Sequence, residues 1–207
     1  LSVLILFQLN AQDKPFVFGV EISPGVSWLN TENSFYSSEG AVFSFNYGLS
    51  MDFYFHKNYA LSTGIQVLSW GGNASYPDLY PFGESEELQP VRSFSNYKYT
   101  AFQIPVYLKL KTNPIGYNSY FADFGFSFLF PFKSTITTHS DFTDGKSVDR
   151  QTQSIMDKTV FASVNLLLGV GIELPISGNT NAQIALRFLN GITSLSNGNA
   201  FKTDGDG

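Results

Sequence analysis

The chain has 207 residues, a formal net charge of −5 and no cysteine. The lack of cysteine excludes disulfide bonds and thiolate metal sites, and the acidic balance argues against nucleic acid as a partner. Charged residues make up only 14% of the chain, against roughly a quarter in soluble domains, whereas aromatic residues reach 16%. This length suits one domain with a substantial core, or one barrel.

The first twelve residues, LSVLILFQLNAQ, combine a short apolar run with small and polar residues around Ala11. Such a run is too short to cross a membrane as a helix, which takes about 20 residues. It is typical of the end of a secretory signal peptide, and the alternative is a first strand of the domain. We predict that residues 1–12 are the signal-peptide remnant of an exported protein and that the domain occupies residues 13–207.

Seven segments have the alternating pattern of β-strands, and no segment has the periodicity of an amphipathic helix. In residues 41–55, AVFSFNYGLSMDFYF, the odd positions are apolar and the even positions are mostly small or polar. These segments reach the length of about 9–11 residues that a tilted strand needs to cross a bilayer. The predicted strands are residues 16–29, 41–55, 59–70, 97–111, 119–133, 159–176 and 182–195.

Short and long connections alternate between these strands. The short ones are residues 56–58, 112–118 and 177–181, and the long polar ones are residues 30–40, 71–96 and 134–158. Outer-membrane barrels have this pattern, with short periplasmic turns and longer extracellular loops. We therefore predict an all-β, transmembrane, up-and-down antiparallel β-barrel whose apolar face contacts lipid. The alternative is a soluble β-sandwich or lipocalin-like barrel, but its solvent face would carry many more Lys and Glu residues.

The polar face of the predicted strands carries a small set of charges. Inside a barrel these charges can pair with one another, whereas on the lipid face an Arg or Lys near the midplane costs about 2–4 kcal/mol. The set holds four acids and three bases, so it is nearly neutral. Side chains just fill a barrel of eight strands, which favours a paired, plugging network over a pore lining. The predicted lumen charge network is Glu21, Asp52, Lys109, Lys111, Asp123, Glu173 and Arg187.

Trp and Tyr residues gather near the ends of the predicted strands. Membrane barrels carry aromatic girdles at these levels, where the wall meets the lipid headgroups. The predicted girdle residues are Trp28, Tyr54, Tyr59, Trp70, Tyr97, Tyr99, Tyr117 and Tyr120.

Four stretches carry short strand motifs: FGVEISPGVSWL (18–29), YTAFQIPVYLKLK (99–111), VNLLLGVGIELPIS (164–177) and ALRFLNGITSLSN (185–197). Together they resemble the PorT-like family of Bacteroidetes, small barrels with an outer membrane protein beta-barrel domain. The resemblance implies an eight-stranded barrel with both termini in the periplasm. Because the pattern yields seven strands, we expect this sequence to be a fragment that lacks the C-terminal strand. The resemblance also implies a place in the cell envelope, and PorT itself is associated with type IX secretion.

Residues that could carry chemistry are few and scattered. His56 lies in a predicted periplasmic turn and His139 in a predicted outer loop, so they cannot share a metal ion. The acidic stretch DFTDGKSVD (141–149) lacks the spacing of a calcium loop. We therefore expect no catalytic site, no metal and no cofactor, and a protein that is not an enzyme.

The long loops are the best candidates for contact with other molecules. Tyr76, Tyr80 and Phe82 form a predicted contact surface beside the acidic stretch GESEEL (83–88). We expect a structural or partner-binding barrel in the outer membrane, surrounded by outer-membrane lipid, whose loops 71–96 and 134–158 contact other envelope proteins. The alternatives are a narrow passive pore for ions or small solutes, and a soluble β-barrel that binds a ligand.

Overall fold

The computed structural model describes residues 2–9, 15–29, 37–82, 87–142, 147–149, 152–177 and 180–193. Within these ranges only the backbone is described for residues 2–9, 78–82, 87–92, 140–142, 147–149 and 158.

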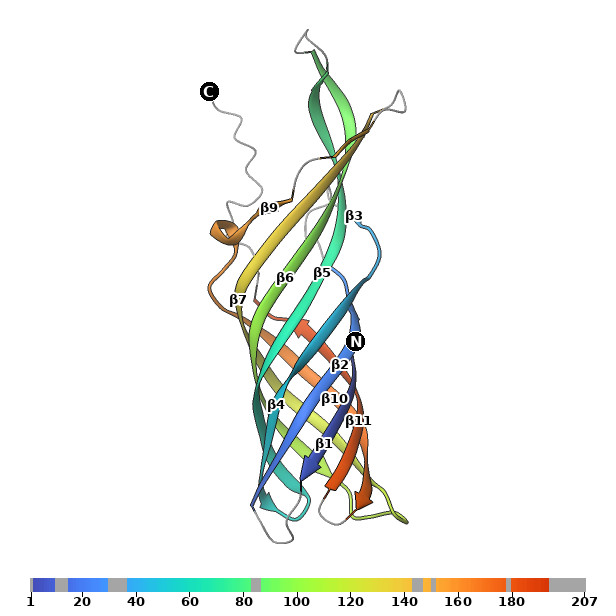
Figure 1. The fold of residues 1–207 in the computed structure, drawn as a ribbon, viewed down its shortest axis with the longest axis vertical. Coiled ribbons are helices and arrows are strands. Elements are labelled where there is room, and N and C mark those ends of the chain that lie inside the picture. Colours follow the sequence, from blue (N-terminus) through green and yellow to red (C-terminus); the bar gives the residue numbers. More distant parts are fainter. Residues whose placement is uncertain are drawn as a thin grey trace.

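Eight long strands form one closed sheet (Figure 1). In order around the ring they are β1 (Ser2–Leu9), β2 (Phe16–Ser27), β4 (Val42–His56), β5 (Tyr59–Phe82), β6 (Glu87–Lys111), β7 (Ser119–Phe142), β10 (Ser163–Ser177) and β11 (Thr180–Gly191). Each strand is antiparallel to both of its neighbours, and β10 closes the ring because it pairs with β7 as well as with β11. The predicted all-β, up-and-down antiparallel barrel is confirmed.

Four short elements lie beyond one end of the barrel. β3 (Ser37–Ser38) pairs with β5, β8 (Ser147–Asp149) and β9 (Gln153–Ser154) pair with β7, and η2 (Met156–Lys158) is a single 3-10 turn. In the described part of the chain, no helix is long and apolar enough to cross a membrane.

The short connections lie together at the opposite end. Lys57 and Asn58 form the turn between β4 and β5, and residues 112–118 join β6 to β7. Gly116 in this second turn has a φ of 69°, which glycine adopts without a steric penalty. Since outer-membrane barrels keep their short turns in the periplasm, we assign this end to the periplasm and the other end to the cell exterior.

Strands β5, β6 and β7 continue well beyond the barrel at the extracellular end (Figure 1). β5 and β6 stay paired up to Phe82 and Glu87, and β7 stays paired with β6 up to its last residue. The prediction of loops at 71–96 and 134–158 is therefore wrong for most of these residues. Small and polar side chains replace the apolar alternation here, although the backbone ladder continues. Buried positions in this extension include Ser75, Ser93, Ser95, Ser134 and Thr138.

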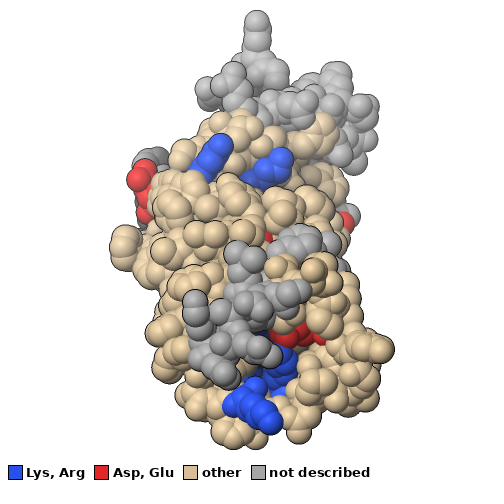
Figure 2. Space-filling model, turned by 60° about the horizontal axis from the view of Figure 1, so that its bottom comes forward, with Lys and Arg blue, Asp and Glu red and all other residues tan. Residues whose placement is uncertain are grey.

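In the barrel strands whose side chains the structure describes, alternation sends apolar side chains outward. In β4, Phe43 and Leu49 are 71% and 64% exposed, whereas Ser50 and Asp52 are 4% and 1% exposed. The wall in Figure 2 is accordingly mostly tan, with charged atoms in only a few places. Such a continuous apolar surface is stable in contact with lipid rather than water. The predicted direction of the apolar face is confirmed.

The aromatic girdle is only partly as predicted. Four of its residues are exposed on the outside: Trp28, Tyr59, Tyr117 and Tyr120. The other four are half-buried or buried: Tyr54, Trp70, Tyr97 and Tyr99. Tyr99 is 9% exposed and stacks on Trp70 with ring centroids 5.4 Å apart. The prediction is wrong for this second group because a place near a strand end does not decide which face the side chain takes.

The first strand also differs from the sequence interpretation. The sequence predicts a signal-peptide remnant over residues 1–12, whereas the structure places Ser2–Leu9 in β1, between β2 and β11. Without a strand here, β2 and β11 would expose unpaired backbone groups to lipid, and this apolar segment can satisfy both. Its removal during export stays a prediction. The predicted absence of a C-terminal strand concerns the chain after residue 193, which lies outside the described residues.

The face assignment predicts the effect of a charge on the wall. Leu49→Arg puts a cation on the lipid side of β4 and should reduce the free energy of unfolding by about 2–4 kcal/mol. Tyr117→Arg is the control, because Tyr117 is 89% exposed in a periplasmic turn and should tolerate the charge. Urea-induced unfolding in lipid vesicles measures both variants. Equal stability of the two would contradict the assignment.

Candidate functional site

The seven charged residues of the predicted lumen network all lie on the inner face of the barrel. Six of them are at most 4% exposed, and Lys111 at the periplasmic end is partly exposed. Charges buried this deeply are stable only when they are paired and hydrogen-bonded. The six come from six different strands: Glu21, Asp52, Lys109, Asp123, Glu173 and Arg187.

Arg187 on β11 is the centre of the larger group. Its Nη1 donates to both carboxylate oxygens of Glu21, at 3.0 and 3.1 Å, and its Nε donates to Oδ2 of Asp123 at 3.0 Å. Its Nη2 lies 2.9 Å from the same Asp123 oxygen and donates to the Tyr107 hydroxyl at 2.7 Å. One guanidinium thus joins β2, β6, β7 and β11, because its rigid fork presents several donors at once.

Lys109 on β6 is the centre of a second group. Its Nζ lies 2.5 Å from Oδ2 of Asp52 and donates to Oε1 of Gln183 at 3.1 Å. The other Asp52 oxygen accepts a hydrogen bond from Ser62 Oγ at 2.6 Å. Lys109 and Asp52 are each 1% exposed, so their charges interact in a nearly dry environment.

Lys111 and Glu173 form the ion pair nearest the periplasm. Glu173 also accepts hydrogen bonds from Nδ2 of Asn181 at 2.8 Å and from Nε2 of Gln183 at 2.9 Å. Gln183 therefore connects this pair to Lys109, because its carbonyl oxygen accepts while its amide group donates. The structure thus brings the seven predicted charges together in two hydrogen-bonded groups.

Sequence reasoning missed the neutral residues that link these charges. Nε2 of Gln66 donates to Glu21 at 2.8 Å, and Oε1 of Gln66 accepts from Asn46 at 2.8 Å. The Tyr107 hydroxyl accepts a hydrogen bond from Arg187, and the Gln183 amide oxygen accepts one from Lys109. Asn46, Tyr107 and Gln183 share the inward parity of a network charge on their own strand, so the signal for these three was present, whereas β5, which carries Gln66, has no network charge. A search of the sequence that is limited to charged residues does not find the amide and phenol side chains that bond to them.

Uncharged side chains fill the interior around Arg187. Tyr107 is 2% exposed and Leu167 is 1% exposed. Gly125 is the cross-strand partner of Tyr107, and a Cβ atom at Gly125 would collide with the backbone and Cβ of Tyr107. The missing side chain at this position therefore allows β6 and β7 to approach closely beside Tyr107. The ion pairs and these packed side chains together fill the barrel at this level, as the narrow bore of eight strands requires.

The predicted contact residues Tyr76, Tyr80 and Phe82 lie on β5 in the extracellular extension. Tyr76 is half-buried, and its hydroxyl accepts a hydrogen bond from Ser95 Oγ at 3.4 Å. The side chains of Tyr80 and Phe82 lie outside the described part of the structure.

Other candidate residues are not brought together. His56 ends β4 at the periplasmic end, and His139 lies on β7 in the extracellular extension. Asp144 and the side chains of Asp141 and Asp149 lie outside the described part of the chain. Among the residues that the structure describes, no three His, Asp or Glu side chains form a group that could hold a metal ion.

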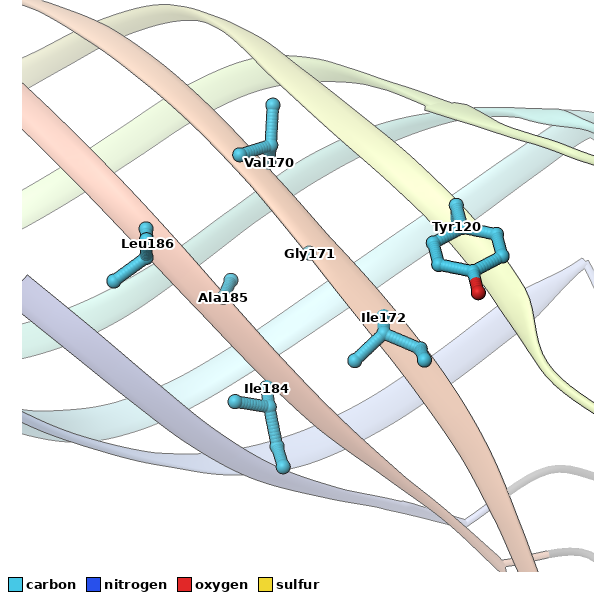
Figure 3. A pocket seen from close by; sticks show the side chains of 7 residues that line it. All are labelled: Tyr120, Val170, Gly171, Ile172, Ile184, Ala185 and Leu186. Carbon is cyan, nitrogen blue, oxygen red and sulfur yellow. The ribbon is translucent and has the colours of Figure 1, made fainter.

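A shallow pocket of about 310 Å³ lies on the wall formed by β7, β10 and β11 (Figure 3). Val170 and Leu186 beside it are 61% and 49% exposed, so it opens towards lipid. Gly171 and Ala185 are cross-strand partners at its base, and Ala185 is only 2% exposed because its side chain faces the barrel interior. Its lining contains no acid–base pair and is apolar apart from one phenol: Tyr120, Val170, Gly171, Ile172, Ile184, Ala185 and Leu186.

The apolar wall, the charged interior and the short periplasmic turns agree with a comparison against known families. The family model described as outer membrane protein beta-barrel domain matches residues 10–197. The chain belongs to the outer membrane protein beta-barrel domain family. The outer membrane is accordingly the location of this barrel domain. The match to the family model begins at residue 10, after β1. No curated protein and no solved structure is significantly similar to the chain.

The barrel domain's interior predicts strong coupling within its ion pairs. Lys109→Met leaves the Asp52 carboxylate buried without its cation and should lower the free energy of unfolding by about 3–5 kcal/mol. The double variant Asp52→Asn/Lys109→Met removes both charges and should recover most of that loss. Urea unfolding in vesicles, analysed as a double-mutant cycle, measures the coupling. Additive effects of the two substitutions would show that the pair does not act as a unit.

Proposed function

We propose that this protein is a non-conducting outer-membrane barrel that acts by binding other envelope components through its extracellular extension. The observation that carries this proposal is the contrast between the two ends of the strands. Inside the barrel, six buried charges and packed rings fill the bore around Arg187. Outside it, β5 and β6 remain paired for another twelve residues beyond Trp70, which is about 40 Å of strand, and β7 stays paired with β6 up to Phe142.

The extension is well suited to contact a partner because it is held rigidly by backbone pairing. β3 and β9 add short strands to its two edges, and hydrogen bonds such as Ser95–Thr138 at 3.0 Å connect its strands through side chains. A projecting sheet of this kind presents its side chains in a fixed arrangement, so less conformational entropy is lost on binding than with a mobile loop. Tyr76, Tyr80 and Phe82 remain our proposed contact residues within it.

The PorT-like resemblance supports binding within a larger assembly of envelope proteins. The specific assembly that it suggests is the type IX secretion assembly. We propose binding rather than catalysis as the activity. A narrow passive pore is the second candidate function, because a barrel of eight strands can conduct if its internal ion pairs rearrange. The filled bore favours the first candidate.

Conductance separates these two functions. Full-length protein refolded from detergent into a planar lipid bilayer should give no stepwise single-channel current, because the paired charges leave no hydrated path. Incorporation is verified by heat-modifiable migration of the same preparation. Regular current steps from folded protein would rule out the plugged barrel and support the pore.

Site-specific crosslinking tests the binding surface. A photoreactive phenylalanine in place of Tyr76 should form a discrete adduct with another envelope protein in intact cells. The same substitution at Tyr117, which is 89% exposed in a periplasmic turn, is the matched control and should not form that adduct. Identical adducts from both positions would show that the extension is not the contact surface.

A further inference from the structure

A β-bulge in β7 changes the direction of a side chain at the upper edge of the apolar wall. Thr100 pairs with Lys133, whereas the next residue, Ala101, pairs with Pro131, so Phe132 is the extra residue. Phe132 and Lys133 are both exposed as a result, although consecutive strand residues normally face opposite sides. The bulge therefore turns Lys133 outward instead of into the barrel.

Lys98 on β6 lies beside Lys133 on this outer face. Because Lys98 pairs with Thr135 and Thr100 pairs with Lys133, the two lysines are diagonal neighbours, with Cβ atoms about 7–8 Å apart. Both side chains are exposed, and neither forms a hydrogen bond or ion pair with any residue that the structure describes. The hydroxyls of Ser69 and Thr100 lie 3.5 Å apart in the same polar row.

This row directly follows the apolar wall. Phe102 and Phe132 are 49% and 47% exposed just below it, with ring centroids 4.8 Å apart. From Leu110 to Phe102, β6 covers about 27 Å of strand, or about 20 Å across the membrane at a tilt of about 40°. The two lysines therefore lie at the level of the lipid headgroups of the outer leaflet.

The other basic side chains that the structure describes lie elsewhere in the barrel. Figure 2 shows blue atoms in two zones, one below the grey tip and one at the periplasmic end. Lys109, Lys111 and Arg187 are bound in the internal ion pairs, and Lys57 lies in a periplasmic turn. In a chain with a net charge of −5, the extracellular edge of the wall thus presents two adjacent cations that have no side-chain partner among the described residues.

We propose that Lys98 and Lys133 bind the phosphate of a phosphorylated glycolipid in the outer leaflet, a lipid of the lipid A type. The two ammonium groups complement the phosphate charge, and the Ser69 and Thr100 hydroxyls complete a polar site around it. The acyl chains of the same lipid lie against Phe102 and Phe132. The site belongs to the barrel wall, so it is independent of the function proposed for the extension.

Native mass spectrometry of the full chain in detergent micelles tests this site with diphosphorylated lipid A as the probe. The wild-type chain should retain bound lipid A and should bind the dephosphorylated form far more weakly. Lys98→Gln/Lys133→Gln should weaken binding about thirtyfold, because each lysine near a charged membrane surface contributes about fivefold. Lys57→Gln is the matched control and should bind lipid A as the wild-type chain does.

Heat-modifiable migration confirms that each variant is folded before binding is compared. Unchanged lipid A binding by folded Lys98→Gln/Lys133→Gln would overturn the proposal, and so would an equal loss in Lys57→Gln. Phosphatidylglycerol that binds as tightly as lipid A would show a general anionic surface instead. Displacement of lipid A by inorganic phosphate would show a soluble-phosphate site. A conducting wild-type barrel would remove the function proposed above but leave this site intact.

Discussion

Backbone hydrogen bonding in lipid is the constraint on which this structure depends. The hydrocarbon core offers no water to unpaired N–H and C=O groups, so every strand in it needs a neighbour on each side. The antiparallel ring satisfies this requirement through the pairing of β10 with β7 and of β1 with both β2 and β11. Once the ring is closed, alternate side chains must face either lipid or a narrow interior. The lipid face is therefore apolar, and the inner face carries small, polar and paired charged side chains.

Closure of the barrel also places charged side chains in a narrow interior. A narrow bore excludes most water, so each charge inside it needs a partner from another strand. Arg187 bonds to Glu21 and Asp123 on two other strands, and Lys109 bonds to Asp52 on a third. These contacts cross the bore and fix the strands relative to one another. They also occupy the narrow bore at this level, which supports the proposal that the protein acts through the outside of the barrel.

Much of this arrangement could be predicted from alternation alone. The pattern in residues 41–55 matches β4 to within one residue at each end, and the parity that places Phe43 outside places Asp52 inside. Alternation does not predict the face of a side chain beyond a β-bulge. The bulge at Phe132 turns Lys133 to the outer face, whereas counting along β7 predicts the inner face. The apolar signal also disappears in the extension, where serine and threonine continue the ladder. Which strand partners a charge finds is set by register, and no pattern within a single strand contains that information.

The central claim is that β4 has one face in lipid and one in a filled, dry interior. Because the chain has no cysteine, single cysteines at positions 43 to 50 can each carry a spin label without competing sites. Collision rates with oxygen and with a water-soluble nickel complex in lipid vesicles then report lipid and water at each position. We predict high oxygen accessibility at the odd positions and low accessibility to both reagents at the even positions. High nickel accessibility along either face, or the opposite alternation, would contradict the account.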